Sequence, residues 1–172
     1  MGNIHITSAS KDDFKVIQTI GKETFYETFA SSNSEENMQQ YLSNSFSDEK
    51  VQEELLNEES EFFIAWEDNL PIGYLKINTG KAQTELQDPS TLEIERIYVK
   101  ASHHGKKIGQ LLYDKTVGIA QEKNVTSIWL GVWEENPRAI RFYEKNGFVE
   151  FDRHIFKMGD EEQTDVMMRK VL

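Results

Sequence analysis

The chain of 172 residues contains no cysteine, only three prolines and no long apolar run. Without cysteine, a disulfide, a thiolate zinc site and a cysteine nucleophile are all excluded. Of the four histidines only His103 and His104 are adjacent, and their spacing is not that of a zinc site, so we expect no metal. No stretch has the length and apolar character of a membrane span, and the first ten residues do not resemble a secretory signal. We therefore expect a cytoplasmic protein that does not bind a membrane.

Positive charge is also scarce, because 19 Lys and Arg face 30 Asp and Glu and leave a net charge of −11. A field of this sign repels the phosphates of DNA and RNA and attracts cations. The excess of acid fits either simple solubility or a cationic substrate, and charge alone does not decide between them. It does count against a direct nucleic-acid partner.

The residues that are present indicate one packed domain over 1–172. The length suits a single core, and the 38% hydrophobic and 11% aromatic content is enough to fill it. N-cap residues predict helices that begin at Ser10, at Asn33 or Ser34, and at Ser47. Two more helices are predicted from the turn near 108 to about 123 and from Asn136-Pro137 to Gly147.

Strands are predicted from alternating or continuous apolar residues at 3–8, 62–66, 70–78, 91–99, 127–133, 148–157 and 164–171. The segments 81–90 and 158–163 are predicted to be a loop and an acidic turn. The expected fold class is α/β (α+β), with a mixed, mostly antiparallel sheet of about seven strands flanked by helices.

The segment 91–113 carries the clearest signal for function. Leu92 and Ile94 share one strand face, but the next apolar pair, Ile97 and Val99, has the opposite parity. One extra residue at Glu95–Arg96 would absorb this slip, so we predict a β-bulge there, a feature that often lies beside active sites. The strand ends at KASHHGKKIG, which leads directly into a helix. Backbone N–H groups at a helix start, next to glycine and lysine, suit a phosphate.

This turn resembles the Q/R-x-x-G-x-G/A motif of GNAT-superfamily acetyltransferases. Gly109 matches the last glycine of the motif, whereas His104 and Lys107 replace the first residue and the first glycine. A second block, Asn136, Ala139 and Tyr143 followed by Gly147-Phe148, resembles the N-x-x-A-x-x-x-Y motif of the same superfamily. From the residues alone, Asn136 is equally well an N-cap and Tyr143 a core residue.

The resemblance implies the GNAT fold and an acetyl-CoA cosubstrate. It implies that Asn136 binds the pantetheine arm, that Ala139 lets it pass and that Tyr143 protonates the departing thiolate. The residues expected to bind the cosubstrate are Ile97, Tyr98, Val99, His104, Gly105, Lys106, Lys107, Ile108, Gly109, Gln110, Asn136, Ala139, Tyr143 and Lys145.

Further blocks, among them ETFYETFASSNSEENMQQYL, LEIERIYV and IWLGVWEENPRAIRFYEKNGF, resemble the PaiA-type polyamine N-acetyltransferases. This resemblance covers nearly the whole chain and implies acetyl transfer to a primary amine of spermidine or spermine. It also brings an older description of that family as regulators of protease synthesis and sporulation. Two alternatives stay open: a different amine acceptor, such as an aminoglycoside, an amino acid or a peptide N-terminus, and a CoA-binding regulator without catalysis.

A protonated amine cannot attack a thioester, so some group must take its proton. Glu93 and Glu95, beside the predicted bulge, are the candidate bases, and pairing with Arg96 and Lys100 is the alternative role for them. We expect the acceptor to contact Tyr26, Glu35, Glu36 and Gly131, although Gly131 could instead relieve crowding between its tryptophan neighbours. An exposed edge strand would allow a homodimer.

Overall fold

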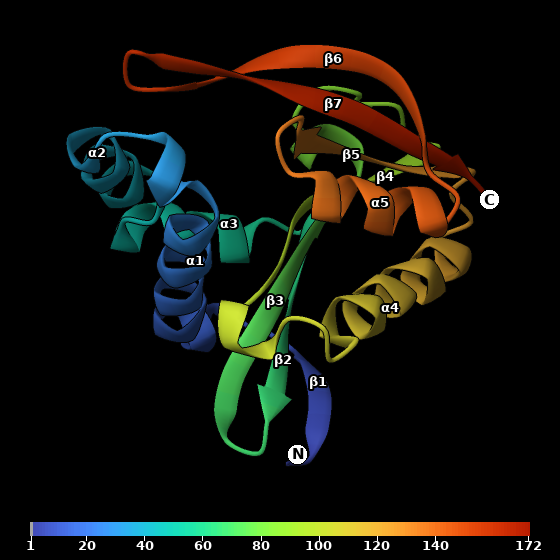
Figure 1. The fold of residues 1–172 in the computed structure, drawn as a ribbon. Coiled ribbons are helices and arrows are strands. Elements are labelled where there is room, and N and C mark those ends of the chain that lie inside the picture. The colour runs from blue at the N-terminus through green and yellow to red at the C-terminus, as the bar shows by residue number, and fades with distance from the viewer. Residues whose placement is uncertain (1) are drawn as a thin grey trace.

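The computed structural model describes residues 2–172 and contains one seven-stranded sheet in the order β1-β2-β3-β4-β5-β7-β6 (Figure 1). Within residues 2–172, β4 and β5 are the only strands that pair in parallel. The strands are β1 (Ile4–Ser8), β2 (Ser60–Glu67), β3 (Leu70–Asn78), β4 (Thr91–Val99), β5 (Ser127–Trp133), β6 (Val149–Met158) and β7 (Glu161–Val171). The helices are α1 (Phe14–Phe29), α2 (Glu35–Ser45), α3 (Asp48–Leu56), α4 (Ile108–Glu122) and α5 (Pro137–Lys145). The predicted fold class and element order are confirmed.

Side-chain caps begin the helices where the sequence predicts them. Ser10 forms a capping box with Asp13 at the 3₁₀ turn that precedes α1. The hydroxyls of Ser34 and Ser47 accept the backbone N–H groups of the third residues of α2 and α3. Asn136 caps α5 in the same way, and Pro137 occupies its first turn.

The acidic segment 158–163 is the clearest difference from the prediction, because only its middle is a turn. β6 runs to Met158, and β7 already starts at Glu161. Gly159 adopts a φ of 63°, which a two-residue turn of this kind favours. The side chain of Asn37 on α2 donates to Asp160 at 2.7 Å, so the hairpin tip is held against α2.

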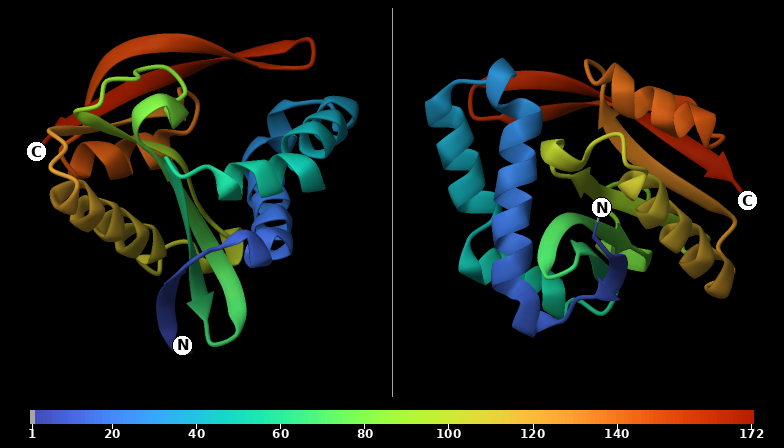
Figure 2. Two further views of the ribbon diagram at one scale, coloured as in Figure 1. Left: turned by 180° about the vertical axis from the view of Figure 1, so that it is seen from behind. Right: turned by 60° about the horizontal axis from the view of Figure 1, so that its bottom comes forward.

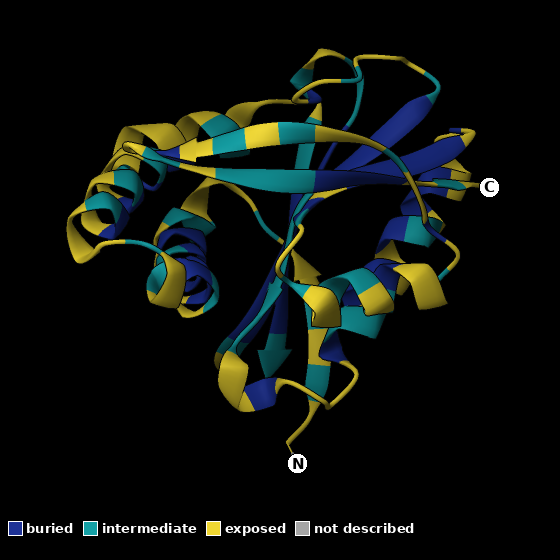
Figure 3. Ribbon diagram, turned by 45° about the horizontal axis from the view of Figure 1, so that its top comes forward, coloured by how far each residue is buried: buried dark blue, intermediate teal, exposed yellow. Residues whose placement is uncertain are grey.

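The helices cover the sheet from two sides (Figures 1 and 2). α4 and α5 share one core cluster with Leu92 and Leu130, whereas α1, α2 and α3 share a second cluster with Phe62 and Tyr74. The helices turn buried residues toward the sheet and exposed residues outward (Figure 3). The sheet therefore separates two cores. A gap between its strands would connect the side covered by α4 and α5 with the side covered by α1, α2 and α3.

Such a gap lies between β4 and β5. The two strands pair only from Thr91 with Ser127 to Ile94 with Leu130, although both continue beyond these residues. On the other edge of β4, the pairing with β3 shifts by one residue at Glu95, which has no partner in the register. The predicted bulge is thus confirmed, and the strands diverge where it begins.

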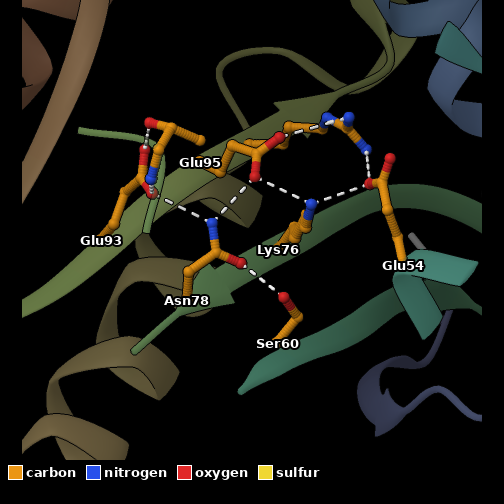
Figure 4. Close-up of polar contacts among 8 residues, drawn as sticks. Glu54, Ser60, Lys76, Asn78, Glu93 and Glu95 are labelled. Atoms are coloured by element: carbon orange, nitrogen blue, oxygen red, sulfur yellow. Dashed lines mark hydrogen bonds and ion pairs between the residues drawn. The ribbon is translucent and has the colours of Figure 1, made fainter. Parts of the chain in front are cut away.

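A closed ring of four largely buried charges stabilises the bulged segment (Figure 4). Lys76 Nζ lies 2.8 Å from both Glu54 Oε1 and Glu95 Oε1, and the Arg96 guanidinium lies 3.0 Å and 3.3 Å from the same two carboxylates. Asn78 also donates to Glu95 at 2.8 Å. Two negative and two positive charges balance, so the ring links α3, β3 and β4 without a net charge.

We expect Glu54→Gln to destabilise the protein by about 3 kcal/mol, because it leaves Lys76 and Arg96 buried with only one carboxylate between them. Urea unfolding of the variant measures this change in the free energy of unfolding. Glu53→Gln, an exposed neighbour on α3, is the matched control and should change it by less than about 0.5 kcal/mol. Equal effects of the two substitutions would contradict a structural role for the ring.

Candidate active-site cleft

A cleft of about 1520 Å³ opens where β4 and β5 diverge. Its walls come from both strands beyond the last pair, from the starts of α4 and α5, from the end of α1, and from β6 and β7. The predicted site residues that line it are Glu93, Glu95, Ile97, Tyr98, Val99, His104, Gly105, Lys107, Ile108, Gly109, Gln110, Gly131, Asn136, Ala139, Tyr143 and Lys145. The structure therefore brings both sequence motifs to one site.

Four predicted residues do not line the cleft. Lys106 lies in the turn before α4 and is exposed. Tyr26 lies in a separate shallow depression and donates to Glu35 at 3.0 Å. Glu35 and Glu36 occupy the first turn of α2, where acidic side chains favour helix formation. Tyr26, Glu35 and Glu36 thus lie outside the cleft.

The start of α4 is unusually open to an anion. Lys107 occupies the N-cap with a φ of 65° and a ψ of 19°, and no side chain caps the helix. Glycine adopts this left-handed conformation more readily than any other residue, so Lys107 has a backbone conformation that favours glycine at the position where the motif has one. Gly105, at a φ of 79°, leaves space around it in which an added Cβ would meet nothing within 4 Å. The first amides of α4 are therefore available to a phosphate beside a lysine.

Tyr143 lies on the face of α5 that turns toward the sheet. Its side chain is only 7% exposed, and its ring packs against Phe142 and Phe148 with centroids 5.4 Å and 5.6 Å away. Burial raises the pKa of the Tyr143 hydroxyl above its ordinary value. A tyrosine hydroxyl is protonated at neutral pH, and burial here further disfavours loss of that proton. At the other end of α5, Asn136 Oδ1 accepts the Ala139 N–H at 3.3 Å.

Glu93 and Glu95 are both held by other residues. Glu93 accepts the N–H and the hydroxyl of Thr84 at 2.8 Å and 2.6 Å and the Asn78 amide at 3.0 Å. Burial raises the pKa of Glu93, and these hydrogen bonds oppose that rise.

Glu95 belongs to the buried ring of charges. Burial would raise the pKa of its carboxyl, but the charges of Arg96 and Lys76 and the hydrogen bonds of Lys76 and Asn78 hold that pKa at about 2. A carboxylate with so low a pKa is a poor proton acceptor at neutral pH.

The charged side chains divide the cleft in two. Near α4 and α5 the lining includes three cations, Lys107, Arg138 and Lys145, with Glu135 in the turn before α5. Across the sheet the lining includes the carboxylates of Glu85, Glu93, Glu95 and Asp165 together with His154. The single cation of that half, Arg96, is paired with Glu54 and Glu95. One half thus suits phosphates and the other a cation.

Aromatic rings complete the acidic half. The Phe29 ring lies 5.3 Å from that of Trp133, and the Tyr41 ring lies 5.7 Å from that of Phe156. The buried Tyr74 hydroxyl also belongs to this wall and has no hydrogen-bond partner among residues 2–172. Aromatic faces beside carboxylates are typical of sites for organic cations.

The sequence did not single out these aromatic residues, nor Glu85, Arg138, His154 and Asp165. The sequence offered one local signal for His154: its position in a predicted strand puts it on the same face as Asp152 and Phe156. Within residues 2–172, no three His, Asp or Glu side chains are grouped so that they could hold a metal ion. No helix in that range has the length and apolar character needed to cross a membrane.

The sequence profile of the acetyltransferase (GNAT) family matches residues 22–148, which include both motifs and most of the cleft. The chain belongs to this family. It is 36% identical over 172 residues to an uncharacterized N-acetyltransferase encoded in the pepI 3′ region of Lactobacillus delbrueckii subsp. lactis, with 100% of this chain and 99% of the relative covered. The protein is accordingly an acetyltransferase of the GNAT type.

Two other similarities concern Thermoplasma acidophilum. Its spermidine N(1)-acetyltransferase is 29% identical over 174 residues, covering 98% of this chain and 97% of the relative. The crystal structure of the PaiA N-acetyltransferase of this organism, in complex with coenzyme A, superposes with a TM-score of 0.81 at 26% identity, covering 99% of each chain. The whole fold of this GNAT protein is therefore shared with a solved relative.

We expect Lys107→Gly to raise the free energy of unfolding by up to about 1 kcal/mol, because glycine removes the strain of a left-handed lysine. The matched control is Lys106→Gly, at a neighbouring exposed position without a positive φ, which should lower it slightly. Thermal and urea unfolding of both variants measures the difference. Loss of stability in Lys107→Gly alone would show that the lysine side chain has a structural role.

Proposed function

We propose that this GNAT protein transfers an acetyl group from acetyl-CoA to a primary amine of a polyamine such as spermidine or spermine. The observation that carries the proposal is the division of one cleft into a cationic half and an acidic, aromatic half. The similarity to a spermidine N(1)-acetyltransferase over the whole chain supports the same acceptor class.

The cationic half fits the phosphates of acetyl-CoA. The uncapped amides at the start of α4 donate hydrogen bonds, and Lys107 adds a positive charge next to them. Gly109 leaves room at the same helix, because a Cβ there would come no closer than 4.0 Å to Phe142. Lys145, at the far end of α5, lines the same half of the cleft.

The divergence of the strands fits the pantetheine arm. β4 stays paired to β3 through Ile97, Tyr98 and Val99, but on its other edge β5 no longer supplies partners. The backbone groups along that edge are free to pair with the amides of an extended ligand, as they would with a strand. The same edge offers backbone N–H groups to an oxyanion.

The acidic half fits the acceptor. Each primary amine of a polyamine has a pKa near about 10 and is positively charged at neutral pH. The carboxylates of Glu85, Glu93 and Asp165 attract such charges, and the rings of Tyr41 and Trp133 accommodate the methylene segments between them.

In the proposed reaction, the amine first loses a proton, and its nitrogen then attacks the carbonyl carbon of the thioester. The tetrahedral adduct collapses when the C–S bond breaks, and the Tyr143 hydroxyl gives its proton to the departing sulfur. The proton that the attacking nitrogen must still lose to become an amide passes to the Tyr143 oxygen, which restores the phenol. Tyr143 is suited to this role because it lines the cleft and its phenol carries a proton at neutral pH. The amine and thioester meet in one ternary complex, so positioning supplies much of the rate and no covalent enzyme intermediate is needed.

Steady-state release of CoA with spermidine, spermine, an aminoglycoside and a peptide amine tests the proposal. We expect the highest kcat/KM with a polyamine. We also expect the KM for the polyamine to rise with salt concentration, because salt screens its attraction to the carboxylates. Preference for the aminoglycoside or the peptide would replace the acceptor but keep the enzyme class. Tight acetyl-CoA binding without turnover of any amine would overturn the proposal in favour of a regulator.

We expect Tyr143→Phe to lower kcat about 100-fold or more while the dissociation constant for acetyl-CoA changes less than about threefold, because only the acid is lost. Stopped-flow or steady-state CoA release and calorimetric titration measure the two quantities. Tyr113→Phe, another buried tyrosine, which lies on α4 and does not line the cleft, is the matched control and should keep its kcat. Unchanged turnover in Tyr143→Phe would remove this residue from the mechanism.

A further inference from the structure

The proposed reaction needs a group that takes the proton of the amine, and the two carboxylates of β4 are poorly placed for this task. A proton on Glu93 would weaken the hydrogen bonds that its carboxylate accepts from Thr84 and Asn78. A proton on Glu95 would remove the charge that pairs with Lys76 and Arg96. A better candidate must line the acidic half, face the diverging strands and be free to change its charge.

We propose that His154 is the catalytic residue that accepts the proton of the acceptor amine, and that Asp165 and Glu85 are its positioning residues. This inference rests on the proposed acetyl transfer and names the group that starts it. All three residues line the acidic half of the cleft.

The imidazole of His154 lies between two carboxylates. Its Nε2 is 3.3 Å from Asp165 Oδ2, and its Nδ1 is 3.0 Å from Glu85 Oε2. Nδ1 is buried and has no hydrogen bond of good geometry among residues 2–172. About 27% of the side chain is nevertheless exposed, and because Nδ1 is buried, Nε2 is the ring nitrogen that can be reached from the cleft and can accept a proton. The ring is thus oriented by charge without being saturated by hydrogen bonds.

The sheet register places this ring over the gap between the strands. His154 pairs with Asp165 across β6 and β7, and Asp165 pairs with Trp133 on β5. Gly131, two residues earlier on the same face of β5, is the first residue after the last pair with β4. A Cβ on Gly131 would lie 3.2 Å from His154 Cε1, so the glycine makes room for the imidazole.

The third group is fixed by the loop after β3. The Gln83 side chain accepts the indole N–H of Trp129 and the hydroxyl of Thr91, both at 2.7 Å. The next residue, Thr84, donates twice to Glu93. Glu85 follows these two anchors directly, so its carboxylate is held at the cleft although the loop has little regular structure.

The charge balance of the step is simple. With a neutral imidazole, Glu85, His154 and Asp165 carry a net charge of −2, which attracts the ammonium group. One N–H bond of the ammonium breaks and one N–H bond to the imidazole forms, so the group's net charge becomes −1 and the amine becomes a nucleophile. Glu93 and Glu95 are the further carboxylates that line this half of the cleft, and Arg96 is paired with Glu95. Arg153, the neighbour on β6, points to Glu134 and Glu150 instead.

His154→Gln tests the inference through its pH profile. A base lets the enzyme use the abundant ammonium form, whereas a variant without a base depends on the scarce free amine. We expect kcat/KM for spermidine to fall about 100-fold at pH 7, with the deficit shrinking toward pH 9.5 as free amine accumulates. His5→Gln on β1, away from the cleft, is the matched control and should keep the wild-type profile. A deficit in His154→Gln that is the same at every pH would overturn the inference.

A second variant tests the role independently of side-chain shape. His154→Gly leaves space open to the cleft, and added imidazole should restore turnover in proportion to its free-base concentration. Absence of rescue, with acetyl-CoA binding intact, would count against His154 as the proton acceptor.

The two proposals fail in different ways. The wild type could acetylate another amine and not a polyamine, while His154→Gln still changes the pH profile of kcat/KM. In that case the proposed acceptor is wrong and the role of His154 stands. If spermidine is acetylated and the variant keeps the wild-type profile, the inference falls and the proposed function stands. If no amine is acetylated, both are wrong.

Discussion

Two parallel strands stay hydrogen-bonded only while their backbones keep the same repeat, and the extra residue at Glu95 ends that match between β4 and β5. Past Ile94 and Leu130 the strands separate, and each leaves one edge of its backbone without a partner. Because the sheet divides two cores, this gap joins the side covered by α4 and α5 to the side covered by α1, α2 and α3. The bulge therefore creates a passage in which two different ligands can meet.

The chain uses its few cations in two ways, which explains how a protein with a net charge of −11 can bind phosphates. Lys107, Arg138 and Lys145 face the half of the cleft beside α4 and α5. Lys76 and Arg96 lie on the acidic side but are neutralised within the buried ring, so they do not repel an ammonium group there. The distribution of charge along the cleft thus depends on which charged residues form ion pairs as much as on which residues line it.

Local patterns in the sequence were sufficient for the elements and for the bulge, because caps, parity and apolar period act over a few residues. The parity change between Ile94 and Ile97 located the irregular residue correctly. The start of β7 was missed, since the glutamates and glutamine at 161–163 carry no apolar alternation and are strand only through pairing with β6. Likewise, Tyr26 on α1 and Glu35 on α2 are residue types suited to a cation, but they bond to each other and do not line the cleft.

The contacts of His154 were beyond any local pattern, since they depend on the register of three strands and on a bulge in β6 between Glu150 and Asp152. The same structure explains why the residues that hold the β4 bulge differ from the residue that takes the proton. Carboxylates that hold the bulge must stay charged throughout the reaction, because a change of charge inside a buried ring is costly. A group that takes a proton in every turnover must instead tolerate both charge states. His154, partly exposed and placed over Gly131, can change its charge without disturbing the strands that define the cleft.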